Sequence, residues 1–232
     1  MELLQRFSEL HVAIKLPVIA LIAYLLGSIN TSILVSKIAL KKDIRNYGSG
    51  NAGFTNAVRS MGWKKGLIVM FGDIGKCALA VVIGQLLYIG NMNFDAGAGG
   101  RLIAGTFVFL GHIYPLYFGL KGGKGVLTFG ITILMFDWRI FLIAFSLFLI
   151  ILFTTKFMSL ASICAALSVL PLVVVFLQTP LSGTPMPFGY FFVALFMVLV
   201  IIFKHRTNIK RLITKTESKF SLKSKKLMEN EK

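Results

Sequence analysis

Charged side chains are scarce in this chain of 232 residues, and acidic ones are the scarcest. Only 15% of the residues are charged, whereas about a quarter are charged in soluble domains. Asp and Glu number 9 against 25 Lys and Arg, which gives a formal net charge of +16. Apolar residues make up 56% and form long runs between short basic clusters. This pattern argues against a soluble domain and is typical of a helical protein that crosses a membrane several times.

Cysteine and histidine are also rare, with 2 and 3 residues. Cys77 and Cys164 both fall inside apolar runs and lack the spacing of metal ligands. A disulfide buried in lipid would be unusual, so both cysteines are interpreted as small packing residues. No metal site is evident in the sequence, and we expect no cofactor.

The apolar runs predict an all-α integral membrane protein with about seven transmembrane helices. A helix needs about 20 residues to cross a hydrocarbon core of about 30 Å. The fourth run is short, since about eleven residues cover roughly half of that core, and five full spans are the alternative topology. The predicted spans are residues 16–40, 66–89, 102–118, 126–136, 140–155, 157–177 and 188–203.

These spans are expected to form a single transmembrane domain, residues 16–217. Residues 1–15 mix charged and apolar side chains and predict a short surface helix. The first apolar run is too long for the core of a signal peptide, and no cleavage site shortens it. Residues 218–232 are rich in Lys, Ser and Glu without periodicity, which predicts a basic disordered tail near anionic lipid.

The distribution of Lys and Arg predicts the orientation of the chain. If the segment after the first span is cytoplasmic, nineteen Lys and Arg lie in cytoplasmic segments and four in outer segments. The positive-inside rule favours this orientation, with the N-terminus outside and the C-terminus in the cytoplasm. Because the charge lies between apolar runs, we expect anionic substrates and membrane lipid as partners, and no nucleic acid. Three segments rich in Gly, Asn, His, Lys and Arg then share the cytoplasmic side.

The first of these segments, residues 43–59, holds small polar residues between two arginines. Its glycines allow tight turns and close approach of a ligand, and successive backbone N–H groups in such a loop can bind an anion. The two arginines can grip phosphate oxygens in forked geometry. A solvated connector is the alternative, but the density of small polar residues favours function. The candidate residues are Arg45, Ser49, Asn51, Thr55, Asn56 and Arg59.

The second segment, residues 111–126, resembles a phosphate-binding loop that leads into a helix N-terminus. Gly125 stands where a Walker A motif has Ser or Thr, and no strand precedes the loop, which argues against a nucleotide triphosphatase. Anchoring at the membrane surface would explain the two lysines but not three glycines in four residues. His112 is either a structural hydrogen-bonding residue or a functional one. The candidate residues are His112, Lys121, Gly122, Gly123 and Lys124.

The third segment, residues 203–217, follows the last span and is strongly basic. It is either a stop-transfer flank or part of a site. His205 and Asn208 are three residues apart, so on a helix they share one face beside the membrane. Glu217 is the lone acid of this segment and is expected to pair with an arginine.

Two ionisable residues, Asp73 and Lys76, fall inside the second predicted span. Such residues usually face the interior of a helix bundle and often mark a function, but a structural hydrogen-bond role is equally consistent. A second polar cluster, residues 28–32, lies within the first predicted span and is interpreted as helix–helix hydrogen bonding.

In their order and spacing, the three polar segments resemble the acyl-phosphate:glycerol-3-phosphate acyltransferase family of bacteria (PlsY). The resemblance spans about residues 25–217, and three motifs in order are far more specific than one Gly-rich loop. Ala52 and Phe54 depart from the Pro and Ala that are more usual in the family. The matching residues are Gly48, Ser49, Gly50, Asn51, Thr55, Asn56, Arg59, Gly111, His112, Pro115, 121–126, His205, Arg206, Asn208, Arg211, Leu212 and Glu217.

The resemblance implies seven membrane helices in the bacterial plasma membrane and an active site at its cytoplasmic face. The implied reaction is attack by the 1-hydroxyl of glycerol 3-phosphate on acyl phosphate, which gives lysophosphatidate and phosphate, the first step of phospholipid synthesis. It implies phosphate binding by residues 122–124 and no cofactor, while the sequence does not indicate an oligomeric state. The implied catalytic residues are Ser49, Arg59, His205 and Asn208, with Glu217 as structural support.

Two other functions were compared with the sequence. Acyltransferases that use acyl-CoA or acyl carrier protein carry H-x-x-x-x-D, but Leu16, Tyr117 and Lys210 stand five residues after the three histidines. A transporter of an organic phosphate fits the basic loops and the polar groups within spans. It is not favoured, because the sequence has no convincing internal repeat.

Overall fold

The computed structural model describes residues 2–89, 97–177 and 188–221. In these ranges every regular element is a helix, as the sequence predicts. The α-helices are α1 (Glu2–Ser8), α2 (Val12–Ser28), α3 (Thr31–Leu40), α4 (Phe54–Met61), α5 (Trp63–Ile89), α6 (Ala98–Ile113), α7 (Val126–Phe136), α8 (Trp138–Thr155), α9 (Met158–Leu177), α10 (Gly189–Lys204) and α11 (Arg206–Ile213), and the 3₁₀ turns are η1 (Ile44–Asn46) and η2 (Leu116–Phe118).

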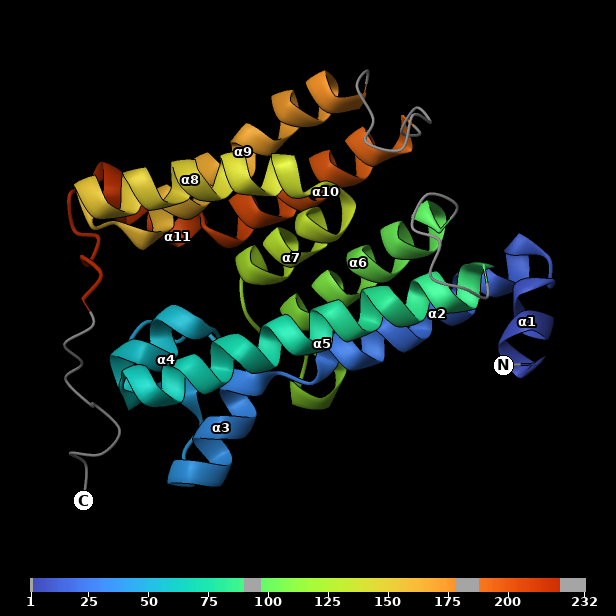
Figure 1. Cartoon of the computed structure of the whole chain (residues 1–232). Helices are drawn as coiled ribbons and strands as arrows, with labels where there is room; N and C mark the ends of the chain where they lie inside the picture. Colours follow the sequence, from blue (N-terminus) through green and yellow to red (C-terminus); the bar gives the residue numbers. More distant parts are fainter. Residues whose placement is uncertain (1, 90–96, 178–187, 222–232) are drawn as a thin grey trace.

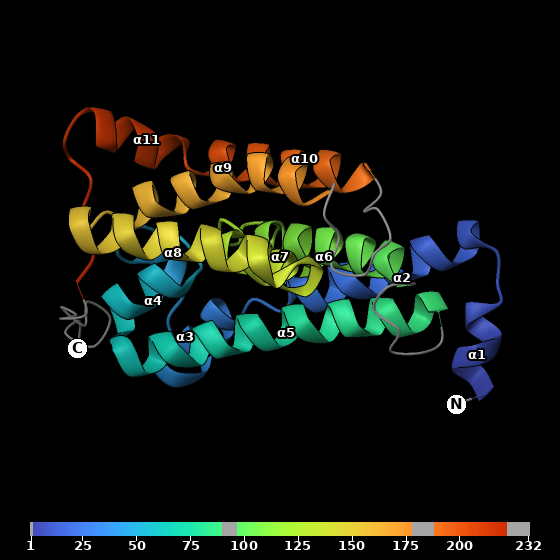
Figure 2. The ribbon, with the colours of Figure 1, turned by 45° about the horizontal axis from the view of Figure 1, so that its top comes forward.

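The long helices pack side by side in a bundle with two unlike ends. Helices α2 and α5 lie on one side, α9 and α10 on the other, and α6 and α7 between them (Figures 1 and 2). The short helices α3, α4 and α11 gather at one end, whereas α1 lies at the opposite end (Figure 1). The three polar segments of the sequence therefore meet at one end of the bundle.

Four helical stretches of the described chain are long and apolar enough to cross a membrane, and a fifth results if a bent pair is one span. The pair is α10 and α11, which meet at 58°. Helix α7 has 11 residues, in agreement with the short fourth span that the sequence predicts. The third predicted span, residues 102–118, is displaced along the chain: α6 begins four residues earlier, at Ala98, and ends five residues earlier, at Ile113, after which a 3₁₀ turn follows. The stretches are Val12–Leu40, Trp63–Ile89, Trp138–Thr155 and Met158–Phe176.

The first predicted span is divided between two helices. Helix α2 ends at Ser28, and Asn30 caps the start of α3, where its side chain accepts a hydrogen bond from the N–H of Ile33. The division leaves carbonyl groups at the end of α2 without helical partners. Lys76 donates to two of them, on Gly27 at 3.2 Å and on Ile29 at 2.8 Å. A continuous apolar run thus contains a break that a buried lysine stabilises.

Asp73 and Lys76 form a buried ion pair at this break. Nζ of Lys76 lies 2.8 Å from Oδ1 of Asp73 and 3.1 Å from Nδ1 of His112. Thr31 donates to the same carboxylate oxygen at 3.1 Å. Gly27 of α2, Thr31 of α3 and His112 of α6 thus all contact the pair on α5, so the cluster joins four helices. Among the two roles that the sequence left open, these contacts favour the structural one.

The ends of the chain differ in how far the structure describes them. Helix α1 lies within residues 1–15, where the sequence predicts a surface helix. Of the predicted tail, residues 218–221 are described, and the N–H of Phe220 donates to the carbonyl of Lys156 at 2.7 Å. Residues 222–232 lie outside the described residues.

Candidate active site

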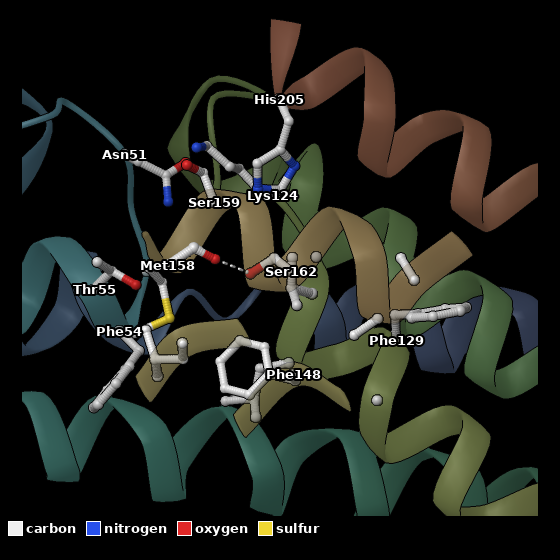
Figure 3. A pocket seen from close by; sticks show the side chains of 18 of the residues that line it. Asn51, Phe54, Thr55, Lys124, Phe129, Phe148, Met158, Ser159, Ser162 and His205 are labelled. Carbon is white, nitrogen blue, oxygen red and sulfur yellow. Dashed lines mark hydrogen bonds between the residues drawn. The ribbon is translucent and has the colours of Figure 1, made fainter. Parts of the chain in front are cut away.

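A cavity of about 640 Å³ lies at the end of the bundle where the polar segments meet. Helices α4, α5, α6, α7, α8, α9 and α11 contribute to its wall. Figure 3 shows polar side chains, among them Asn51, Lys124 and His205, at one end of it, and rings such as those of Phe129 and Phe148 away from them. The cavity therefore suits a ligand with a polar head and an apolar tail.

The first polar segment enters the cavity through a loop with two positive-φ glycines, Gly48 at 58° and Gly50 at 70°. The buried side chain of Asn56 fixes this loop, since its oxygen accepts from the N–H of Ser49 at 2.9 Å. Its nitrogen donates to the carbonyls of Tyr47 and Ile44 at 3.0 and 3.3 Å. A Cβ at Gly48 would lie 2.3 Å from the Asn56 side chain, so the loop requires glycine there. The residues of this segment that line the cavity include Ser49, Asn51, Thr55, Asn56 and Arg59.

Arg45 lies outside the wall of the cavity, although the sequence predicts that it grips phosphate beside Arg59. Its guanidinium binds Asp43, with Nη2 at 2.8 Å from the carboxylate, and donates to the carbonyls of Phe118 and Lys121 at 2.7 and 3.2 Å. The hydrogen bonds from Arg45 lower the pKa of Asp43 below its usual value. Arg45 thus connects the first polar segment to the second instead of facing a substrate.

The second polar segment folds back onto the end of α6. The N–H groups of Gly122 and Gly123 donate to the carbonyls of Ile113 and His112, both at 3.1 Å. A Cβ at Gly123 would lie 2.1 Å from the ring of His112, so the loop is too close for any side chain there. Neither glycine lines the cavity, and neither does Lys121; their loop instead delivers Lys124 into it. His112 lies in the wall of the cavity, and its carbonyl and ring both contact the loop at Gly123.

His205 stands at the bend between α10 and α11. Its Nδ1 lies 2.8 Å from the carbonyl oxygen of Ile201, which can only accept, so Nδ1 carries the proton and Nε2 is the acceptor. Burial, together with the charge of Lys124, lowers the pKa of His205 to about 4. The imidazole is therefore neutral at neutral pH and offers an acceptor to the cavity.

Asn208 connects a lysine and a carboxylate at the polar end. Its side-chain oxygen accepts from Lys124, and its nitrogen donates to Glu217 at 2.7 Å. Glu217 also accepts from Ser159 and from Arg211, each at 2.7 Å, which confirms the predicted pairing with an arginine. Burial raises the pKa of Glu217, but these hydrogen bonds outweigh it, and the net shift is downward. The carboxylate therefore remains ionised and holds α11 against α9.

Lys124 is the central cation of this end of the cavity. Burial lowers its pKa to about 8; the carboxylate of Glu217 opposes this shift, and the charges of Arg211 and Arg59 add to it. Three cations thus converge on one place with a single carboxylate among them. Such a surplus of positive charge favours an anionic ligand.

The apolar part of the cavity lies between α7, α8 and α9. Rings of Phe141, Phe145 and Phe148 stack in sequence along α8, with centroids 5.4 and 6.0 Å apart. Within the described residues, no group of three or more His, Cys, Asp or Glu is placed to hold a metal ion. The arrangement offers charge stabilisation and positioning for an anionic amphiphile.

A family model for glycerol-3-phosphate acyltransferases matches residues 17–215. The chain belongs to this family. It is an acyltransferase, and the resemblance of the three polar segments to this family is confirmed.

Relatives and solved structures of the acyltransferase agree with this. A glycerol-3-phosphate acyltransferase of Prochlorococcus marinus (strain MIT 9215) is 40% identical over 199 residues, 86% of this chain and 94% of the relative. That of Bacillus subtilis (strain 168) is 36% identical over 200 residues, 86% of this chain and 94% of the relative. The crystal structure of PlsY, an integral membrane glycerol 3-phosphate acyltransferase, in its glycerol 3-phosphate form has a TM-score of 0.77 at 34% identity, covering 89% of this chain and 96% of that chain. With its apolar helices, the acyltransferase is a multi-pass membrane protein.

The cavity of the acyltransferase collects most of the residues predicted from the sequence and adds others. Ser159 is the main addition, since it is buried, lines the cavity and binds Glu217. It lies inside an apolar run, where a serine usually bonds to its own helix, so no local pattern distinguishes it. Ser162 follows that usual pattern and donates to the carbonyl of Met158 at 2.8 Å (Figure 3).

Proposed function

We propose that this acyltransferase moves an acyl group from acyl phosphate to the 1-hydroxyl of glycerol 3-phosphate, giving lysophosphatidate and phosphate. One observation carries the proposal: a single cavity joins the cationic cluster of Lys124, Arg59 and Arg211 to a long apolar region. Each substrate carries a phosphate, and the donor also carries an acyl chain. The related PlsY has been crystallised in glycerol 3-phosphate and lysophosphatidic acid forms, which supports this acceptor and this product.

Acyl phosphate fits a site that offers cations and hydrogen-bond donors. It is a mixed anhydride with a good leaving group, so positioning and charge stabilisation are the main requirements. We assign Lys124 and Arg59 to the phosphate groups, and Ser49 and Asn208 to the orientation of the reacting atoms. These four residues all line the cavity.

The proposed reaction is a direct transfer. The 1-hydroxyl oxygen bonds to the acyl carbon, the bond from this carbon to the bridging oxygen breaks, and phosphate leaves with the electron pair. Neutral His205 accepts a hydrogen bond from the hydroxyl at Nε2 and orients it, because its pKa of about 4 makes it a weak base. The proton passes to the departing phosphate, whose second pKa lies near neutrality.

For the membrane arrangement, we propose seven membrane segments, an outer N-terminus and a cytoplasmic active site in a bacterial plasma membrane. Residues 16–217 form the transmembrane domain. The positive-inside bias and the common end of the three polar segments support this orientation. The acyl chain then occupies the apolar region between α7, α8 and α9, within the bilayer.

The test is ester formation by the purified protein in lipid, with labelled glycerol 3-phosphate and either acyl phosphate or acyl-CoA. We expect labelled lysophosphatidate from acyl phosphate alone. Product from acyl-CoA alone would contradict the donor. No product from either donor, in protein shown to be folded, would contradict the reaction and favour transport, which flux measurements in sealed vesicles would detect.

A further inference from the structure

The wall of the cavity continues beyond the part of the chain that the family model matches. The match ends at residue 215, whereas Ser218 and Phe220 both line the cavity. Phe220 is half-buried, while its neighbours Ser218, Lys219 and Ser221 are exposed. Phe220 is thus the one apolar side chain that residues 218–221 contribute to the wall of the cavity, beside the small polar Ser218.

Two sets of hydrogen bonds fix the position of residues 218–221. Immediately before the segment, the carboxylate of Glu217 accepts from Ser159 and Asn208, both at 2.7 Å. Within the segment, the N–H of Phe220 donates at 2.7 Å to the carbonyl of Lys156; this lysine is the C-cap residue of α8 and has a φ of 61°. The segment therefore crosses the turn between α8 and α9 in a fixed position. Ser159, which binds Glu217, lies at the start of α9 in the same wall.

The site has a chemical reason to exclude water there. Acyl phosphate reacts with water as well as with an alcohol: water oxygen bonds to the acyl carbon, the bond to the bridging oxygen breaks, and phosphate leaves with the electron pair. The products are a carboxylate, phosphate and a proton. Transfer to glycerol 3-phosphate succeeds only if bound donor is protected from this reaction.

We propose that Phe220 is a water-excluding residue of the active site, which lowers the hydrolysis of bound acyl phosphate beside the Ser159–Glu217 contact. The inference rests on the proposed function. It assigns Phe220 no contact with the reacting atoms, so its effect is on the choice between water and alcohol. A side chain that only stabilised the fold would change transfer and hydrolysis together.

The experiment compares the full-length protein with Phe220→Ala, Phe220→Gln and Phe220→Leu in lipid. Phosphate release and lysophosphatidate are measured from acyl phosphate, with and without glycerol 3-phosphate, in water labelled with ¹⁸O. Without acceptor, we expect the Ala and Gln variants to release phosphate about tenfold faster than wild type, with ¹⁸O in the carboxylate. Leu keeps an apolar surface and stays near wild type. Lys219→Ala, at an exposed neighbour, is the matched control.

The outcomes separate this inference from the proposed function. If wild type forms no lysophosphatidate from acyl phosphate, the proposed function fails. If wild type transfers the acyl group but Ala and Gln leave hydrolysis unchanged, the role of Phe220 is overturned and the proposed function stands. The Gln variant fills more of the space of Phe220 than Ala does and is polar, so it tests the proposal if the Ala variant does not fold.

Discussion

Asp73 and Lys76 within α5, and Glu217 and Lys124 at the cationic end of the cavity, are two combinations of a carboxylate with a lysine in different surroundings. Asp73 also lines the cavity, but Lys76 does not. In α5 the ammonium contacts the carboxylate directly at 2.8 Å and also donates to two carbonyls. At the cavity, Asn208 stands between the lysine and the carboxylate. The first lysine is satisfied by the protein, whereas the second lies among arginines at a cavity.

The difference shows what separates a structural charge from a functional one in a helical bundle. A buried charge whose partners all come from the protein joins helices, and its removal affects the fold. A cation that lies near two arginines and reaches a carboxylate only through Asn208 has capacity for an anionic substrate, and its removal affects the reaction. Predictions for Lys76, Asn208, Lys124, Arg59 and Arg45 test this distinction.

The largest effect is expected for Lys76→Met. This change leaves the Asp73 carboxylate buried without its cation, and breaking a buried pair costs about 3–5 kcal/mol. We expect a clear fall in the thermal unfolding temperature in detergent. Turnover per folded molecule should fall less than in Asn208→Ala, because Lys76 reaches the cavity only through Asp73 and His112. The double variant Asp73→Leu, Lys76→Met removes both charges and should recover part of the loss. An unchanged unfolding temperature in the single variant would refute the structural role.

For Asn208→Ala, we expect a loss of turnover with little change in stability. The side chain positions Lys124 and faces the cavity, and removal of one positioned polar group of this kind typically costs about 10²–10³ in rate. Steady-state kinetics with labelled glycerol 3-phosphate measure it. Lys210→Ala, exposed on the same helix, is the matched control. A variant that keeps more than about a tenth of the wild-type rate would remove Asn208 from the catalytic residues.

The pH dependence should identify Lys124. Its pKa of about 8 means that the cation is present below this pH and lost as pH rises through it. We expect kcat/KM to fall above about pH 8, by up to about tenfold per pH unit, because this ratio reports the free enzyme. Lys124→Arg keeps its charge and should move the fall to higher pH. An identical alkaline limb in both proteins would assign it to another group.

Much of the fold and the site could be predicted from the sequence, and the exceptions have physical reasons. The apolar runs predict the helices, because hydropathy is a property of the local sequence. The three polar segments interrupt these runs, so most residues of the site could also be predicted. The break at Asn30 could not be predicted, because a lysine 46 residues away supplies its hydrogen bonds. Ser159 and Phe220 depend on partners as distant as Glu217 and Lys156, and no local pattern marks such contacts.

Arg45 and Arg59 are a second example of what the sequence alone does not reveal. Both flank the same Gly-rich loop, and only their contacts in the structure show that they have different roles. The carbonyls that Arg45 binds belong to Phe118 and Lys121, more than seventy residues away. Arg59→Ala should raise KM for a phosphate-bearing substrate, because a cation is lost from the cavity.

The smallest effect is expected for Arg45→Ala, at about 1 kcal/mol of stability, because its pair with Asp43 is partly exposed. The increase in KM should be smaller than in Arg59→Ala, because Arg45 affects the cavity only by positioning the second polar segment, residues 111–126. Arg45→Lys keeps the charge but not the fork of donors, so it should restore little. Equal increases of KM in Arg45→Ala and Arg59→Ala would show that both arginines bind substrate, and would contradict the separation of the two.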